Sequence, residues 1–272
     1  MQPTEQMLND APPPYESRRC VASLEAFDPL ALPWREMRKN PRDFPDRDVA
    51  KVSRARTVVG LTFVDRNGAP QRIYVKRSLL RGAFRQLAAR FRDSKELREF
   101  ELAGAFLRAG FTVPEPLYYS EAPMKSESAR AIFYATRALP ERWKVAKEFF
   151  KGSRTFAAEW ESLAMFTRLL HERGVLHSDY RSDHLFMDRD CIAAGEPPTR
   201  CWALIDLDGS RCGRAVSRGE RDRAMRQLAE SLITSGLVEE DLKRFLEIYD
   251  REGKWGLDAA AILKAAKGRM KK

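Results

Sequence analysis

The chain has 272 residues and a formal net charge of +10 at pH 7, with 43% hydrophobic and 32% charged residues. This composition excludes a disordered chain and predicts a globular protein with a sizeable core. No apolar run approaches the roughly 20 residues that a membrane-spanning helix needs. The N-terminus lacks the basic segment and apolar core of a secretory signal, so we expect a cytoplasmic protein. The positive charge favours a polyanionic partner.

The chain begins with a proline-rich segment, residues 1–45, that shows no sustained hydrophobic periodicity. Such a composition predicts a loosely ordered extension. After it we expect two lobes, formed by residues 46–139 and residues 140–272.

A β-hairpin is predicted at the start of the first lobe. Residues 57–64 are β-branched and apolar, and Asn67-Gly68 is a strong signal for a tight turn. The return strand, residues 72–76, is expected to end at Lys76. An arginine-rich segment then extends to Arg92.

A helix is predicted to follow. Asp93 is a good N-cap residue, and Glu96 lies three positions further on, as in a capping box. This helix carries Glu99, and Gly110 ends it. Residues 131–136 form another strand candidate.

The second half of the chain is mainly helical. Apolar residues spaced by three or four predict a long helix over residues 156–173. A hydrophobic strand is expected over residues 202–207, and three further helices after it. A strand-rich half with one helix, followed by a helical half, predicts an α+β fold of two lobes.

Residues 175–188 have the residue order of a phosphoryl-transfer site. Asp179, in the sequence His177-Ser178-Asp179, is a candidate to accept a hydrogen bond from an acceptor hydroxyl and to take its proton. Asp206 is expected to end the strand 202–207. A carboxylate at such a strand end is a typical magnesium ligand.

Three further side chains near Asp179 are candidates for the same chemistry. His184 occupies the position where protein kinases place a metal-binding asparagine, and it is a candidate to bind the metal, phosphate or Asp179. Arg181 is a candidate to neutralise charge on the transferred phosphoryl group. His177 is interpreted as an anchor of the loop rather than as a base.

Lys76 and Glu99 are candidates for an ion pair that positions an ammonium on nucleotide phosphates. Charges about 4 Å apart at an effective dielectric constant near 20 interact by about 4 kcal/mol before desolvation. A solvated Lys76 is the plain alternative, Glu101 competes with Glu99, and Asp208 competes with Asp206. The order of lysine, helix glutamate, His-x-Asp and strand aspartate favours a kinase.

The chain resembles the lipopolysaccharide core kinases, which phosphorylate heptose or 3-deoxy-manno-octulosonic acid (Kdo), over roughly residues 50–250. The most specific segments are 174–179, 184–188 and 204–208. Further segments of the resemblance are 51–57, 73–77, 98–102 and 107–116. A histidine at position 184 is similar to that family and unlike ordinary protein kinases.

The resemblance implies a protein-kinase-like two-lobed fold, with an antiparallel-sheet N-lobe containing one helix and a mainly helical C-lobe. It implies ATP and Mg²⁺, with Lys76 and Glu99 as the phosphate-binding pair, Asp179 as the catalytic carboxylate and Asp206 as the magnesium ligand. The implied acceptor is an inner-core sugar of lipopolysaccharide at the anionic inner-membrane face, where the protein would be peripheral.

Two features depart from ordinary kinases. Ser178 replaces the usual arginine, and no Gly-x-Gly-x-x-Gly loop precedes the hairpin, so that only Ser53 and its neighbours are available to cover the phosphates. Three alternatives remain open: a kinase-like enzyme for another small molecule, a nucleotide-binding pseudokinase, and a nucleic-acid-binding protein. The last rests on charge alone, so no nucleic acid is expected. The sequence does not predict an oligomeric state.

Overall fold

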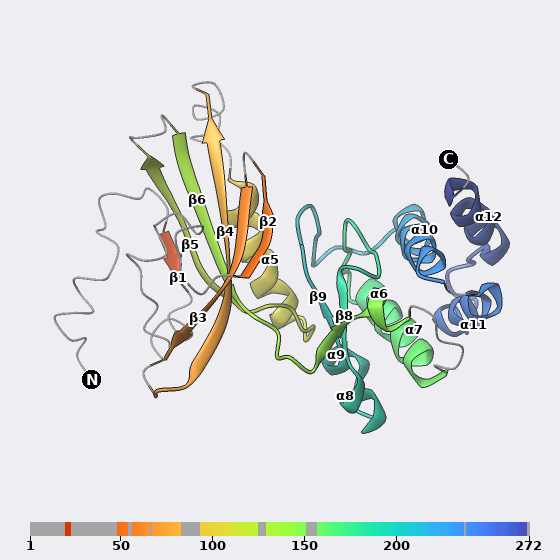
Figure 1. Ribbon diagram of the computed structural model, residues 1–272. Coiled ribbons are helices and arrows are strands. Elements are labelled where there is room, and N and C mark those ends of the chain that lie inside the picture. Colours follow the sequence, from red (N-terminus) through yellow and green to blue (C-terminus); the bar gives the residue numbers. More distant parts are fainter. Residues whose placement is uncertain are drawn as a thin grey trace. The chain divides into compact units, whose positions relative to one another are not determined.

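In a computed structural model, the chain divides into two compact units (Figure 1). The first contains residues 1–101 and 115–138, and the second contains residues 102–114 and 139–272. The structure describes residues 20–22, 48–53, 56–65, 67–82, 93–124, 129–150, 157–236 and 238–270. Most of the predicted extension and most of the arginine-rich segment lie outside the described residues.

The first unit contains a six-stranded antiparallel sheet, as the strand-rich half of the sequence predicts. Its strand order is β1-β5-β6-β4-β3-β2. The strands are β1 (Cys20–Ala22), β2 (Asp48–Val52), β3 (Arg56–Val64), β4 (Pro70–Arg81), β5 (Pro116–Met124) and β6 (Ala129–Arg137). The kinase-like α+β fold class is confirmed by this sheet together with the helical second unit.

The predicted hairpin is formed by β3 and β4. Asp65 accepts hydrogen bonds at Oδ1 from the backbone N–H groups of Asn67 and Ala69, and Gly68 takes the positive φ of 79° that this turn requires. The return strand does not end at Lys76, because β4 continues to Arg81 and pairs with β6 along its length. Lys76 therefore lies in the middle of the sheet.

Helix α5 (Lys95–Arg108) begins two residues later than Asp93. The hydroxyl of Ser94 accepts the hydrogen bond from the backbone N–H of Leu97, so Ser94 is the cap and the predicted capping box at Asp93 is wrong. Leu97 packs with Tyr119 and Ile132 of the sheet. This packing turns Glu96 toward β4, where it accepts a hydrogen bond from Ser78, instead of back toward the helix N-terminus.

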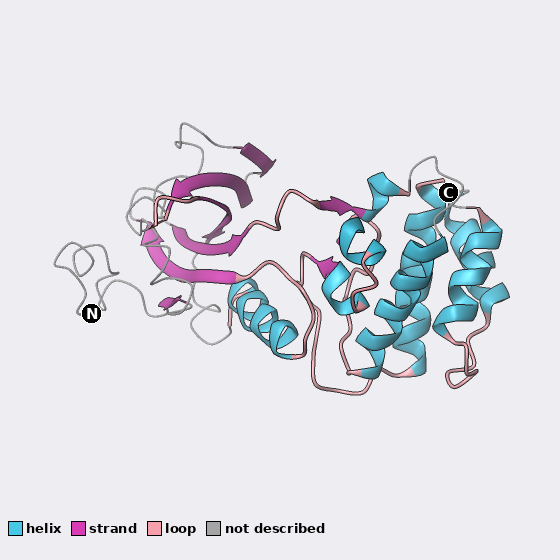
Figure 2. Cartoon of the chain, turned by 90° about the horizontal axis from the view of Figure 1, so that it is seen from below, coloured by secondary structure: helices cyan, strands magenta, loops and turns pink. Residues whose placement is uncertain are grey.

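The second unit combines helices with a small sheet (Figure 2). Its longer helices are α7 (Ala157–Glu172), α10 (Arg218–Thr234), α11 (Glu239–Tyr249) and α12 (Ala259–Met270). Short helices α6 (Ala146–Phe149), α8 (Arg189–Ala193) and α9 (Pro198–Cys201) flank strands β7 (Trp143–Val145), β8 (Leu185–Asp188) and β9 (Trp202–Leu204), which pair in the order β7-β8-β9. The strand predicted over residues 202–207 is shorter, ending at Leu204.

Aromatic side chains fill the core of the second unit. The rings of Phe150 and Trp160 stack with centroids 4.0 Å apart, and Trp202 is fully buried beside Phe150 and Phe166. The indole N–H of Trp202 donates to the Ser162 hydroxyl at 2.9 Å, so that its polar atom is satisfied. This core fixes β8 and β9, the strands that flank the functional segments.

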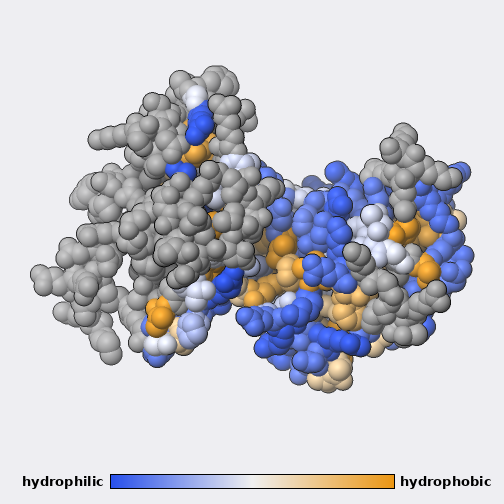
Figure 3. All heavy atoms as spheres, in the orientation of Figure 1, coloured by the Kyte–Doolittle hydropathy of each residue, from blue (hydrophilic) through white to orange (hydrophobic). Residues whose placement is uncertain are grey.

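The described surface is mostly hydrophilic on the face that Figure 3 shows, with smaller apolar areas between the charged side chains. Among the residues described, the large apolar side chains that remain exposed are those of Val64, Leu107, Met165 and Val238. Within the described ranges, none of the helices has the length and hydrophobicity to span a bilayer.

A buried histidine of α7 contacts α11. His171 is 4% exposed, and its Nδ1 shares a hydrogen bond of 2.5 Å with the Tyr249 hydroxyl. Burial, with smaller contributions from Arg221 and Arg211, lowers the pKa of His171 to about 3. The ring is therefore neutral in the folded protein at neutral pH.

The free energy of unfolding is expected to fall as the pH decreases from about 6.5 toward 3. Over this range the unfolded chain binds a proton at residue 171 that the folded chain does not bind. Each pKa unit corresponds to about 1.4 kcal/mol, so the loss from this residue is at most about 5 kcal/mol. In a His171→Gln variant this contribution disappears. Chemical denaturation across the pH range should show the stability difference between native protein and variant shrinking on acidification. A difference that stays constant with pH would contradict the assignment.

Candidate active site

The loop that contains Asp179 is held against the second unit's core on two sides. The hydroxyl of the buried Tyr180 is 2.7 Å from Thr167 Oγ1 on α7. The backbone N–H of Ser182, which is also fully buried, donates to Ser231 Oγ on α10 at 2.9 Å. These contacts fix the backbone on either side of Arg181 and leave Asp179 about half exposed.

His177 connects this loop to the segment that carries Asp206. Its Nε2 donates to the carbonyl oxygen of Ile205 at 2.9 Å, and its Nδ1 accepts from the backbone N–H of Asp179 at 3.3 Å. Burial lowers the pKa of His177, while the Ile205 carbonyl and the charges of Asp206 and Asp179 partly oppose the shift. Both carboxylates therefore lie near one buried neutral ring, which agrees with an anchoring role for His177.

Ser178 provides a second connection between the same two segments. Its hydroxyl donates to the backbone carbonyl of Asp208, and its backbone N–H donates to Ser210 Oγ at 3.1 Å. Gly209 lies beside this contact, and its φ of 70° is the feature that favours glycine here, since a Cβ would be in ordinary contact with the Ser178 side chain at 3.4 Å. The sequence presented Ser178 only as a replacement for arginine. Its contact joins residues 30 positions apart, so the local sequence carried no signal for it.

The backbone completes this connection on both sides. Leu176 and Arg211 exchange two hydrogen bonds of 2.9 Å, and the N–H of Ile205 donates to the carbonyl of His184 at 3.1 Å. Residues 176–184 and 205–211 therefore form one unit of backbone and side-chain hydrogen bonds, which we call the paired loops.

Asp206 has an unusual backbone conformation. Its φ is 54°, and it is the one non-glycine residue with positive φ in the part of the chain that the structure describes. Non-glycine residues in this left-handed region cost roughly 1 kcal/mol or more, and such strain is concentrated at functional sites. Because β9 ends at Leu204, the carboxylate stands on a turn beyond the strand, exposed to solvent.

His184 lies against Asp179. Its Nδ1 is 2.9 Å from the Asp179 carbonyl oxygen and 3.5 Å from Oδ2 of the same residue. Since a carbonyl only accepts, Nδ1 carries a proton in this contact, and Nε2 is the ring nitrogen left for another partner. A histidine with this tautomer is the type that binds metals through its second nitrogen.

Arg181 is turned toward Asp183. The Nε of Arg181 is 3.4 Å from Asp183 Oδ1, and half of the arginine side chain is exposed. The structure thus brings Asp179, Asp206, His184 and His177 together, with Arg181 on the same loop and its guanidinium beside a different carboxylate.

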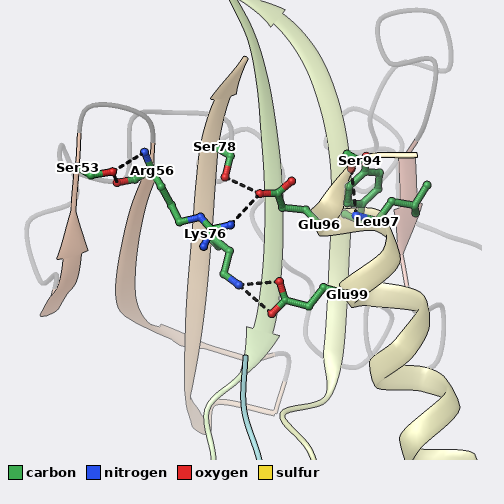
Figure 4. A network of polar contacts seen from close by, with 9 residues as sticks. Ser53, Arg56, Lys76, Ser78, Ser94, Glu96, Leu97 and Glu99 are labelled. Carbon is green, nitrogen blue, oxygen red and sulfur yellow. Dashed lines mark hydrogen bonds and ion pairs between the residues drawn. The ribbon is translucent and has the colours of Figure 1, made fainter. Parts of the chain in front are cut away.

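In the first unit, Lys76 and Glu99 form an ion pair. The Lys76 Nζ donates to both carboxylate oxygens of Glu99 at 2.8 and 2.7 Å, and both side chains are largely buried (Figure 4). The ammonium also lies 5.6 Å from the centre of the Tyr134 ring. Glu101, the alternative partner, is exposed. Helix periodicity explains the choice, because Glu99 shares the sheet-facing side of α5 with Glu96.

Ser53 lies in the turn between β2 and β3. Its hydroxyl donates to the Arg56 carbonyl at 3.1 Å and accepts from the Arg56 N–H at 3.0 Å, and the residue is exposed. The side chain thus closes its own turn. A phosphate-binding role for Ser53 stays a prediction.

The donors present are compatible with Mg²⁺ but not with a tight metal site made of protein alone. No cluster of three or more histidine, cysteine or acidic residues with metal-binding geometry occurs among the described residues. Mg²⁺ is typically held by one or two carboxylates together with substrate phosphates and water. Asp206, exposed and preset by its backbone, fits that requirement.

The comparison with known protein families decides the class. The model of the Lipopolysaccharide kinase (Kdo/WaaP) family matches residues 47–249. The chain belongs to this family. It is therefore a phosphotransferase of the kinase type that acts on a sugar. A search of curated proteins finds no match.

One solved structure supports the fold. The structure of WaaP in complex with acyl carrier protein is 20% identical to this chain, covers 92% of this chain and 97% of its own, and has a TM-score of 0.57. Two kinases match less well. A divergent Toxoplasma kinase lacking the glycine-rich loop is 12% identical, with 77% of each chain covered and a TM-score of 0.41. The bifunctional kinase-methyltransferase WbdD is 12% identical, with 73% and 41% covered and a TM-score of 0.44.

The strained backbone of Asp206 gives a test of the site's geometry. An Asp206→Gly variant is expected to be more stable than Asp206→Ala by about 1 kcal/mol, because glycine adopts a positive φ without penalty. At Asp208, whose φ is not positive, the glycine variant should be no more stable than the alanine variant. Chemical denaturation of the four variants measures both differences. Equal stabilities at position 206 would contradict the left-handed conformation.

Proposed function

We propose that this family member transfers the γ-phosphoryl group of ATP, in the presence of Mg²⁺, to a hydroxyl of a heptose or Kdo residue in the inner core of lipopolysaccharide. The observation that carries the proposal is the pair of loops joined by His177, since they hold Asp179 and Asp206 around one buried ring. Two carboxylates fixed in this way are what phosphoryl transfer requires of the protein.

Asp179 is the proposed catalytic carboxylate. Its side chain is half exposed, so a sugar hydroxyl has access to it. The backbone N–H of Asp179 is committed to His177 and its carbonyl to His184, so the residue is held from both sides. In the proposed reaction it accepts the hydrogen bond of the attacking hydroxyl and takes its proton late.

Asp206 is the proposed magnesium ligand, with His184 as a second candidate through Nε2. When bound, Mg²⁺ would neutralise charge on the phosphates of ATP. The protein's contribution is the preset position of the Asp206 carboxylate, which needs no backbone change to present its oxygens. The exposed guanidinium of Arg181 supplies positive charge on the loop that carries Asp179 and His184.

Lys76 is the proposed phosphate-binding cation of the first unit. Glu99 holds its Nζ through both carboxylate oxygens, which fixes the ammonium in one position before a nucleotide arrives. Removing Glu99 would leave a largely buried charge without compensation, a change that typically costs about 3–5 kcal/mol. The pair therefore positions the lysine as well as neutralising it.

The acceptor is proposed to be presented at the anionic inner face of the membrane, with the protein bound peripherally. Support comes from the net charge of +10 and from exposed basic side chains on two helices of the second unit: Arg218, Arg223, Arg226, Lys264 and Lys267. Basic residues near an anionic surface contribute about 1 kcal/mol each.

Radiolabelled phosphate transfer tests the proposal directly. The native protein with Mg²⁺ and γ-labelled ATP should label dephosphorylated lipopolysaccharide core. Asp179→Asn and Asp206→Asn should each lower the rate by about 100-fold or more, because each removes a charged group that acts on the reacting atoms. Asp190→Asn on α8, an exposed aspartate outside the paired loops, is the matched control and should keep the native rate.

Two different acceptors distinguish phosphorylation of heptose from phosphorylation of Kdo. A core that ends at Kdo and a core that carries heptose are supplied in parallel, and label on only the second identifies heptose. Thermal stabilisation by ATP without label on either acceptor would contradict the lipopolysaccharide acceptor and favour another small molecule or a pseudokinase. If the protein transfers no label and is not stabilised by nucleotide, the kinase proposal as a whole is contradicted.

A further inference from the structure

Two cations and two carboxylates alternate on the side of the first unit's sheet that faces α5. Lys76 is paired with Glu99, and Arg56 lies beside Glu96, with Arg56 Nη2 3.5 Å from Glu96 Oε1 (Figure 4). The strand register explains the arrangement. Arg56 is opposite Ser78 and Val58 is opposite Lys76, so Arg56 and Lys76 are diagonal neighbours on one face.

The contact between Arg56 and Glu96 is loose, whereas the neighbouring contacts are tight. Ser78 Oγ donates to the same oxygen of Glu96 at 2.6 Å, and Lys76 reaches Glu99 at 2.7 Å. Only Nη2 of the Arg56 guanidinium is engaged, and only weakly, among the described residues. About a quarter of the Arg56 side chain is exposed, and none of its nitrogens belongs to the buried polar atoms without a partner. Its Nε and Nη1 donors are therefore open to solvent.

The turn before Arg56 explains why a side chain is needed here. No glycine-rich sequence occurs between β2 and β3. Ser53 uses its backbone N–H and its hydroxyl on Arg56 itself, with the N–H 2.7 Å from the Arg56 carbonyl. Neither the amide nor the hydroxyl of Ser53 is therefore available for an anion. The guanidinium of Arg56 is the cationic group with free donors that this strand directs toward Lys76.

We infer that Arg56 binds a phosphate of the nucleotide, with its guanidinium beside Glu96, which Ser78 holds in place, on the face of the sheet that carries Lys76. A guanidinium suits this task, because Nε or Nη1 can donate to a phosphate oxygen while Nη2 remains beside Glu96. Arg56 thus takes the role that backbone amides of a glycine-rich loop have in other kinases. The inference rests on the proposed function, since it assumes that ATP is the phosphoryl donor.

A purely structural role for Arg56 is the competing explanation. Glu96 is 4% exposed, and a buried carboxylate needs a compensating charge. In that case, removal of Arg56 would weaken nucleotide binding only by disturbing Glu96. Neutralising Glu96 at the same time would then restore binding, whereas a direct phosphate contact would stay lost.

The inference is tested on the full chain, independently of turnover, by comparing the binding of adenine nucleotides with that of adenosine, which has no phosphate. Dissociation constants for ATP, ADP and adenosine in the presence of Mg²⁺ are measured by thermal stabilisation and by calorimetry. The proteins compared are native, Arg56→Ala, Arg56→Ala/Glu96→Gln, and Arg98→Ala, an exposed arginine on the same helix as Glu96. Both Arg56 variants should bind ATP and ADP about 10-fold or more weakly, as expected for loss of charge-assisted hydrogen bonds. Adenosine binding should not change, and Arg98→Ala should match the native protein.

Three outcomes would overturn the inference. The first is that Arg56→Ala binds ATP and ADP as tightly as the native protein does. The second is that the double variant recovers the affinity that Arg56→Ala has lost. The third is an equal loss for adenosine, which would indicate general damage to the unit. If Arg56→Ala does not fold, the double variant, which lacks the buried charge, decides the question alone. Failure of the native protein to bind any nucleotide would instead contradict the proposed function.

Discussion

The neutral ring of His177 is the contact on which the rest of the candidate site depends. It joins the loop of Asp179 to the segment of Asp206 by one donated and one accepted hydrogen bond, and it can do both only as a neutral imidazole. Burial keeps it neutral by lowering its pKa. The two carboxylates are separated in sequence by β8, α8, α9 and β9, so a contact of this kind is required to hold them in one place.

Ser178 and Gly209 reinforce the same connection at its other end. The serine hydroxyl donates to the Asp208 carbonyl, and the adjacent glycine adopts the positive φ of this turn. An arginine at position 178 would be too long for this contact, so the departure from the usual kinase sequence is compatible with tight pairing of the loops. Strain at Asp206 is tolerated because the surrounding hydrogen bonds determine its backbone from both sides.

In the first unit, the main structural requirement is the compensation of buried charges. Two carboxylates of α5 face the sheet, and each lies beside a cation from a strand. Burial of unpaired charges would cost several kcal/mol each, so the pairs are mutually required. The tight pair fixes Lys76, while the loose pair leaves most donors of Arg56 accessible. The two pairs thus differ in geometry: the Lys76 ammonium is held closely by its carboxylate, and the Arg56 guanidinium is not.

Much of the fold was predictable from local sequence. The Asn67-Gly68 turn, the apolar spacing of the helix 157–172 and the alternation of strand and helix signals all depend on neighbouring residues, and these elements occur as expected. The strands β1, β2, β5, β7 and β8 were not predicted. They are short or interrupted by proline and charge, and their stability comes from pairing with distant strands.

By itself, the sequence determined which residue types carry the chemistry and their order along the chain: lysine, helix glutamate, His-x-Asp and a second aspartate. Only the tertiary structure decided which of the competing residues is used and how. Glu99 rather than Glu101 pairs with Lys76, because Glu99 lies on the face of α5 that packs against the sheet. Lys76 lies within β4 rather than at its end, because β4 continues to pair with β6 beyond it. The tertiary structure also set Asp206 in a left-handed turn and directed Arg56 toward Glu96. These outcomes depend on contacts between residues far apart in sequence, and local propensities do not contain them.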